Sequence, residues 1–122
     1  MPEYTPREMM AVAAAREISD GDIVFCGTGI SMLAAMAAKH ISAPNSVIFF
    51  ETGAIDSLLE EVPLAVGDPR VMYWTSVNGG LSESFATMQN PYTGQRVVGI
   101  LGGAQSDLYG NLNSTVIGDY TR

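Results

Sequence analysis

Apolar residues in this chain form short runs that alternate with alanine-rich stretches of helical spacing. The runs predict β-strands over residues 23–26, 47–50, 71–74 and 96–101, and the stretches predict helices over residues 5–18, 30–39 and 82–88. Thr5, Pro6 and Glu8 occupy the positions of an N-cap, a first helical residue and the third residue of a capping box. The first helix is therefore expected to begin at this point.

The order of strands and helices indicates the fold class. Strands separated by helices imply right-handed crossovers and hence a mostly parallel sheet. The strands are apolar without alternation, which is typical of strands covered on both faces. The sequence predicts an α/β fold with an open, mostly parallel sheet and helices on both faces, and Tyr73 and Trp74 are expected to fill the core beside it.

The residues from Gly102 onward differ from the rest of the chain. They read GGAQSDLYGNLNSTVIGDYTR, and little of this segment predicts a helix or a strand. So polar and glycine-rich an ending is unusual for a complete domain. We expect either a flexible tail or a fold that is incomplete within these residues.

Composition and charge narrow the classes of protein. The 122 residues suffice for one domain, and a net charge of −7 with only six Lys and Arg provides no basic face for nucleic acid. One His and one Cys do not suffice for a self-contained zinc or iron–sulfur site. No apolar run reaches the roughly 18 residues of a membrane span, and no signal peptide is visible. The chain is expected to be a cytoplasmic protein that binds neither nucleic acid nor membranes.

Glycine-rich loops follow three of the predicted strands. The loop residues are Gly27, Thr28 and Gly29 after the first strand, Glu51, Thr52 and Gly53 after the second, and Gly102 and Gly103 after the last. In open parallel sheets, ligands bind beyond the carboxyl ends of the strands, which share one edge. We therefore expect the three loops to lie together there, with the Glu51 carboxylate between two glycine-rich loops.

These residue types in this arrangement suit acyl chemistry. Glycine loops let backbone N–H groups approach a ligand closely, and two such groups can stabilise an oxyanion. A carboxylate beside them is a candidate nucleophile or base. The pattern alone leaves an equal alternative open, in which Glu51 is a partly exposed charge at a strand end and the glycines only form turns.

Other residues give weaker signals. The segment CGTG resembles part of a dinucleotide-binding fingerprint, and Glu51 follows Gly29 by roughly the 20 residues such a fold requires, but the third glycine is absent. Cys26 at a strand end is more typical of a buried apolar residue than of a nucleophile. His40 is expected to cap a helix or lie on the surface, and Ser31 lacks the G-x-S-x-G context of a nucleophile.

Five segments, taken in order, carry a family resemblance. They are YTPREMMAVAAAREI, VFCGTG, FETGAID, EVPLAVGDPR and LGGAQSDLYGNLNSTVIGDY. Together they resemble the β subunit of class I coenzyme A transferases, particularly the glutaconate CoA-transferase type, over essentially the whole chain. The resemblance implies the α/β fold shared by CoA-transferases and NagB-like proteins. Because β subunits of this family are about twice as long, residues 1–122 would be the N-terminal part of a β-subunit domain.

The resemblance also implies roles by position. Glu51, in an E-x-G motif with Gly53, would be the nucleophile, and backbone N–H groups of residues 27–29 and of Gly102 and Gly103 would be the oxyanion donors. Glu51 would carry a glutamyl–CoA thioester while CoA moves between an acyl-CoA and a carboxylic acid. Coenzyme A is then a substrate, with no permanently bound cofactor and no metal. The implied partner is an α subunit in a hetero-oligomer.

The chain departs from the family pattern at the nucleophile. Many relatives have Ser-Glu-Asn-Gly there, whereas this chain has Phe-Glu-Thr-Gly over residues 50–53, nearer the glutaconate type. Superfamily members that hydrolyse or decarboxylate CoA thioesters often replace the glutamate, so the presence of Glu51 favours transfer. The alternatives are a CoA-thioester hydrolase, a decarboxylase, or an inactive truncated subunit that only binds its partner.

Overall fold

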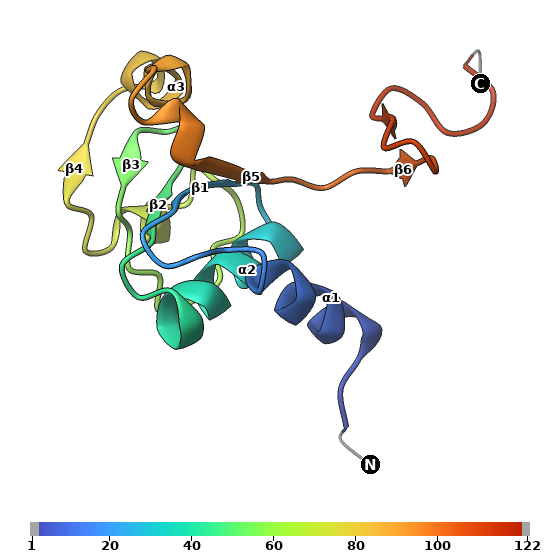
Figure 1. Ribbon diagram of the computed structural model, residues 1–122, viewed down its shortest axis with the longest axis horizontal. Helices are drawn as coiled ribbons and strands as arrows, with labels where there is room; N and C mark the ends of the chain where they lie inside the picture. Colours follow the sequence, from blue (N-terminus) through green and yellow to red (C-terminus); the bar gives the residue numbers. More distant parts are fainter. Residues whose placement is uncertain (1–2, 121–122) are drawn as a thin grey trace.

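The computed structural model of the protein describes residues 3–120 (Figure 1). Helix α1 (Pro6–Ala15) begins at the expected capping box. Thr5 Oγ1 accepts a hydrogen bond from Glu8 N at 3.2 Å, and Thr5 N donates to Glu8 Oε2 at 2.6 Å. These two bonds satisfy backbone donors that a helix start would otherwise leave unpaired, so the local sequence sets where the helix begins.

The other helices also lie where the apolar spacing predicts them. α2 (Ile30–Ala37) continues into a π-helical segment, η1 (Ala38–Ser42), and α3 (Leu81–Gln89) comes later in the chain. Two short 3₁₀ turns complete the helical elements: η2 (Pro69–Met72) lies before α3, and η3 (Gly94–Arg96) lies after it. Within residues 3–120, no helix combines the length and the apolar character needed to cross a membrane.

A five-stranded mixed sheet forms the centre of the molecule. Its strands are β1 (Ile23–Cys26), β2 (Val47–Phe49), β3 (Ala54–Ile55), β4 (Val77–Asn78) and β5 (Val97–Ile100), in the order β4-β3-β2-β1-β5. β1 pairs in parallel with β2 and β5, whereas β3 pairs antiparallel with β2 and β4. The prediction of an open, mostly parallel α/β sheet is confirmed.

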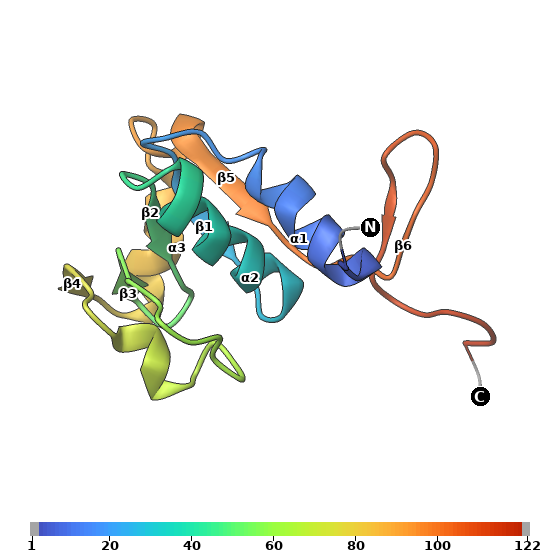
Figure 2. The ribbon, with the colours of Figure 1, turned by 90° about the horizontal axis from the view of Figure 1, so that it is seen from below.

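Helices cover both faces of this sheet, as predicted (Figures 1 and 2). α1 and α2 lie on one face, where their alanines allow close approach and bury Val24 and Ile48 from the strands. α3 lies on the other face, where the ring of Phe85 is 6.2 Å from that of Phe25, which in turn is 5.3 Å from that of Phe49. The main apolar core therefore lies between the sheet and the first two helices.

The predicted strand over residues 71–74 is wrong. Asp68 caps the 3₁₀ turn η2, because its carboxylate accepts a hydrogen bond from the backbone of that turn. Trp74 then adopts a φ of +53°, which is incompatible with an extended strand. Tyr73 and Trp74 are 49% and 74% exposed, so they do not fill the core as expected. A capping aspartate followed by proline favours the turn over the strand.

After β5 the chain leaves the body of the molecule. The segment of residues 101–120 extends away from the sheet and carries a two-stranded hairpin of β6 (Gln105–Ser106) and β7 (Leu112–Asn113) (Figures 1 and 2). Every residue of this segment except Asn113 is exposed. The segment is more regular than its sequence predicted, but it buries almost nothing among the described residues.

A partly buried ion pair ties η1 to the sheet. Lys39 Nζ lies 2.8 Å from Asp56 Oδ1 and 2.6 Å from the carbonyl oxygen of Ser46, and Ser76 Oγ donates to Asp56 Oδ2 at 2.8 Å. Burial alone would raise the pKa of Asp56. The hydrogen bonds from Lys39 and Ser76 and the Lys39 charge outweigh that effect and hold the pKa below its usual range.

Replacing Lys39 by Met is expected to lower the free energy of unfolding by about 1–3 kcal/mol at pH 7, because it leaves a partly buried carboxylate without its cation. A carboxyl with a lowered folded-state pKa stabilises the fold above its unfolded pKa of about 3.9 and loses that contribution as the pH falls through the folded value. The difference from wild type should therefore shrink below about pH 3.9. Urea unfolding between pH 7 and pH 3 measures it, with Lys39→Arg as the charge-retaining control. An undiminished difference at pH 3 would contradict the assignment.

Candidate active site at the carboxyl edge of the sheet

The loops after β1, β2 and β5 begin side by side, because these strands are parallel. The register pairs Phe25 with Phe49 and Cys26 with Ile100, so all three strands end at nearly the same level. Gly27 extends the pairing by one step, since its N–H donates to Ile100 O at 3.2 Å. The structure thus brings the beginnings of the three predicted loops to one edge, the usual ligand-binding edge of an open α/β sheet.

The order of the loops along this edge differs from the expectation. β1 lies between β2 and β5, so the loop of residues 27–29 is the middle one. Glu51 lies on one side of it, and Gly102 and Gly103 lie beyond the end of β5 on the other. Glu51 is therefore not between two glycine-rich loops. The expectation followed chain order, whereas the first strand pairs with both later parallel strands and so occupies the centre.

Glu51 stands in a tight turn that joins β2 to the antiparallel strand β3. Phe50 N donates to Ala54 O and Gly53 N donates to Phe50 O, both at 3.0 Å, which closes the turn around Glu51 and Thr52. The Glu51 side chain is partly exposed, and no described residue forms a hydrogen bond or an ion pair with its carboxylate. The turn fixes the backbone while the carboxylate stays available to a ligand.

Position 53 in this turn requires a glycine, because of its backbone conformation and a close contact with another backbone. Its φ is +96°, and a Cβ added there would lie 2.0 Å from the carbonyl oxygen of Gly79. Gly79 N in turn donates to Gly53 O at 2.8 Å. Gly79 was not among the residues predicted from the sequence. The signal for it is the pair Gly79-Gly80 before a helix, which allows two backbones to touch.

The loop of residues 27–29 leads directly into α2. Gly29 has a φ of +77° and no side chain caps the helix there, so N–H groups of the first turn of α2 have no side-chain acceptor. Thr28 is exposed beside them. Gly102 and Gly103 are both exposed, and a Cβ at Gly102 would meet nothing within 4 Å. The positive φ explains the glycine at position 29, whereas neither φ nor packing requires the one at position 102.

The surroundings of Cys26 and His40, two residues that gave weaker signals in the sequence, indicate structural roles. Cys26 is 1% exposed, and burial raises the pKa of its thiol to about 12, so the thiolate is not populated near neutral pH. This agrees with the interpretation of Cys26 as a small buried apolar residue. His40 is exposed, as expected, and its Nε2 lies 2.9 Å from Leu59 O, which links η1 to the segment after β3.

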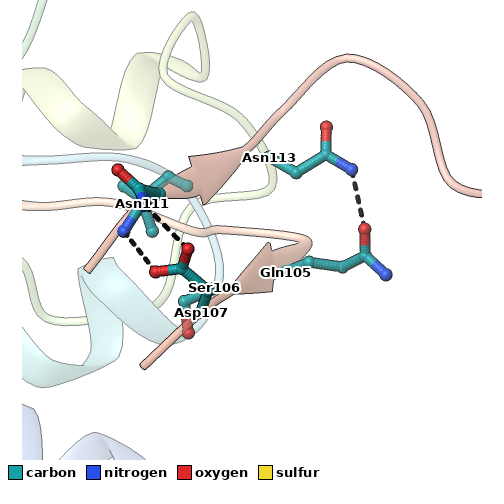
Figure 3. A pocket seen from close by; sticks show the side chains of 6 residues that line it. Gln105, Ser106, Asp107, Asn111 and Asn113 are labelled. Atoms are coloured by element: carbon teal, nitrogen blue, oxygen red, sulfur yellow. Dashed lines mark hydrogen bonds between the residues drawn. The ribbon is translucent and has the colours of Figure 1, made fainter. Parts of the chain in front are cut away.

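Hollows in the surface lie near this edge and on the hairpin. One of about 320 Å³ lies between Thr52 and the segment from Val66 to Met72, and Thr52 Oγ1 is buried without a hydrogen-bond partner among the described residues. Another, of about 270 Å³, lies in the β6–β7 hairpin, where Asp107 accepts hydrogen bonds from Asn111 (Figure 3). Within residues 3–120, no group of three or more His, Cys, Asp or Glu side chains could hold a metal ion.

The structure is an α/β fold in which the carboxyl edge of the parallel strands carries the Glu51 carboxylate, in the loop next to the one that leads into α2. Among residues 3–120, no side chain pairs with this carboxylate and none caps α2. The chain belongs to the coenzyme A transferase family, because the model of that family, described as Coenzyme A transferase, matches residues 7–122. This confirms the family resemblance seen in the sequence.

Two curated relatives refine the comparison. The chain is 40% identical over 122 residues to the B subunit of glutaconate CoA-transferase from Acidaminococcus fermentans, an alignment that covers 96% of this chain and 45% of the relative. It is 38% identical over 123 residues to the B subunit of 3-oxoadipate CoA-transferase from Pseudomonas knackmussii, covering 100% of this chain and 46% of the relative. The chain therefore spans about half the length of the curated relatives it matches.

Solved structures agree with the fold. Glutaconate coenzyme A-transferase from Acidaminococcus fermentans superposes with a TM-score of 0.85 at 38% identity, covering 98% of this chain and 47% of that chain. The decarboxylase AibA/AibB superposes with a TM-score of 0.79 at 24% identity, covering 98% and 49%. At that identity the second likeness supports the fold alone.

Proposed function

We propose that this chain is part of a B-type CoA-transferase subunit, which moves CoA between an acyl-CoA and a carboxylic acid. Glu51 is the nucleophile, and coenzyme A is a substrate rather than a bound cofactor. The observation that carries the proposal is the Glu51 carboxylate, which has no partner within residues 3–120 and is held in a hydrogen-bonded turn at the carboxyl edge of the sheet, beside the loop of residues 27–29. Two curated relatives that are named as B subunits of CoA-transferases support the class of reaction.

The proposed reaction has two half-reactions at Glu51. Its carboxylate attacks the thioester carbonyl of the donor, and CoA leaves as a thiolate, which yields an acyl–glutamyl anhydride. The thiolate then attacks the glutamyl carbonyl, giving a glutamyl–CoA thioester and the free donor acid. The acceptor carboxylate takes the CoA by the same steps in reverse, which regenerates the Glu51 carboxylate. The anhydride would hydrolyse in water, so the complete site must exclude water.

Backbone N–H groups are the proposed oxyanion donors in each attack. Those of residues 27–29 follow β1, the strand next to β2, and those of Gly102 and Gly103 follow β5, one strand further along the same edge. Fixed backbone donors cost no reorganisation when charge develops. The proposed partner is an α subunit, because the curated relatives are named as B subunits. The acyl-CoA and the acceptor acid would bind to the hetero-oligomer.

The proposal predicts a covalent intermediate on Glu51 in the complete α/β enzyme. After incubation with acyl-CoA and reduction with borohydride, the peptide that contains Glu51 should carry an alcohol in place of its carboxyl. Peptide mass mapping detects this change as one oxygen lost and two hydrogens gained. Enzyme treated with borohydride without acyl-CoA is the control. Turnover with no modification at Glu51 would refute the assignment.

The same preparation distinguishes transfer from the alternatives. Acyl-CoA consumption that requires an acceptor acid supports transfer. Sustained consumption without any acceptor would instead indicate a hydrolase or a decarboxylase. If a correctly assembled enzyme neither consumed acyl-CoA nor formed the thioester, the chain would be a subunit that only binds its partner.

A further inference from the structure

One buried hydroxyl, on α3, contacts the turn that contains the proposed nucleophile. α3 lies on the face of the sheet opposite to α1 and α2. Ser84 lies in the first turn of α3 and is 0% exposed, and its Oγ donates to the carbonyl oxygen of Phe50 at 2.6 Å. Phe50 is the residue that immediately precedes Glu51. No pattern in the sequence singles out Ser84, because it is separated from that carbonyl by 34 positions.

The Phe50 carbonyl accepts two hydrogen bonds. One comes from Gly53 N within the turn at 3.0 Å, and the other comes from Ser84 on α3. The peptide group between Phe50 and Glu51 is planar, so holding its oxygen from two directions also fixes the Glu51 nitrogen and Cα. The hydroxyl thereby orients the backbone from which the carboxylate extends.

α3 is itself anchored to the same turn. Gly79 N donates to Gly53 O at 2.8 Å just before the helix, and Glu83 Oε2 accepts a hydrogen bond from Gly80 N at 2.9 Å at its start. Ser84 N donates to Gly80 O at 3.1 Å, which makes that first turn continuous with the anchor. The donor is therefore carried on an element with a fixed position relative to the nucleophile.

We propose that Ser84 is a positioning residue, which holds Glu51 in the orientation for attack on the thioester through its hydrogen bond to the Phe50 carbonyl. This inference rests on the proposed nucleophilic role of Glu51. If the Ser84 hydroxyl only provided a hydrogen bond to the buried Phe50 carbonyl, its loss would change the stability of the fold but not the rate of the reaction. A positioning role affects the chemical step, because a misplacement of about 1 Å can slow a reaction by about 100-fold.

The test compares Ser84→Ala with Ser46→Ala in the complete enzyme with its α subunit. Ser46 is a matched control: it is 1% exposed, it precedes β2 at the opposite end from Glu51, and its Oγ donates to Ala43 O at 2.7 Å. Both variants delete one buried hydroxyl that donates to a backbone carbonyl. Ser84→Ala is expected to lower kcat by about 10- to 100-fold with KM for acyl-CoA within about twofold, and to slow formation of the glutamyl thioester equally. Ser46→Ala should keep kcat within about twofold of wild type.

Ser84→Cys keeps the size of the side chain with a weaker donor, and it should lower kcat by an intermediate factor. It also serves as the decisive variant if Ser84→Ala does not assemble. Wild-type kcat in either Ser84 variant, or an equal loss in Ser46→Ala, would overturn the positioning role while leaving Glu51 as the nucleophile. If wild-type enzyme turned over without thioester at Glu51, the proposed function would fail first and the inference with it.

Discussion

Replacing Glu51 by Ala or Gln is expected to lower the rate of CoA transfer by at least about 10⁴-fold, a loss typical of deleting a covalent nucleophile. Neither side chain can form the acyl–glutamyl anhydride or the glutamyl thioester. Using both variants guards against slow hydrolysis of the Gln side chain back to Glu. Glu51→Asp keeps a carboxylate on a shorter side chain, so it should retain a measurable fraction of the wild-type rate.

The structure allows this loss to be separated from unfolding. The Glu51 carboxylate is partly exposed and forms no hydrogen bond or ion pair with a described residue, so its removal should change the free energy of unfolding by less than about 0.5 kcal/mol. Steady-state assays of the α/β enzyme with acyl-CoA and acceptor acid, together with urea unfolding, measure both effects. Glu60→Gln is the control, because Glu60 is an exposed carboxylate outside the site. Wild-type kcat in Glu51→Ala would remove Glu51 from the mechanism.

Local sequence signals predicted the parts of the fold that depend on neighbouring residues. The capping box at Thr5 and Glu8 lies within one helical turn, and the apolar runs of β1, β2 and β5 are long enough to be recognised as strands. Because these strands are parallel, their ends, and hence the loops at residues 27–29 and at Glu51, could be placed at one edge of the sheet from the sequence alone.

The features of the fold that could not be predicted from the sequence depend on contacts between segments that are distant along the chain. β3 and β4 are two residues each, too short for a pattern, and they exist because they pair with each other and with β2. The central place of β1 depends on which strands pair, and a pattern of apolar runs does not specify that. The apolar residues up to Trp74 led to the prediction of a strand, whereas in the structure Asp68 caps a 3₁₀ turn there. The Asp-Pro pair that favours this turn is visible in the sequence, but the prediction gave more weight to the apolar residues.

In the candidate site, too, some residues could be predicted from the local sequence and others could not. Glu51 and Gly53 could be predicted because they follow an apolar strand, and the resemblance strengthened their assignment. Ser84 and Gly79 could not, because their roles arise from hydrogen bonds to Phe50 and Gly53 that join elements remote in sequence. Residues that hold the backbone beside Glu51 in place are thus less visible in the sequence than Glu51 itself.

Gly53→Ala is the substitution expected to damage both stability and activity. A Cβ there would lie 2.0 Å from the Gly79 carbonyl oxygen and 2.5 Å from its carbon, and these are backbone atoms that cannot rotate away. The φ of +96° adds strain of about 1–3 kcal/mol for any residue with a side chain. The variant must separate the Glu51 turn from the start of α3. We expect a loss of at least about 3 kcal/mol in unfolding free energy and at least about 100-fold in kcat.

The control for this substitution is Gly99→Ala. Gly99 is exposed, its φ lies outside the left-handed region, and an added Cβ would meet nothing within 4 Å. Its unfolding free energy should stay within about 0.5 kcal/mol of wild type, and its kcat should be unchanged. Urea unfolding and steady-state assays of both variants in the α/β enzyme measure the difference. A Gly53→Ala enzyme as stable and as active as Gly99→Ala would mean that the contact between the two backbones does not hold Glu51. Loss of activity at full stability would mean instead that the contact orients the turn without contributing to folding.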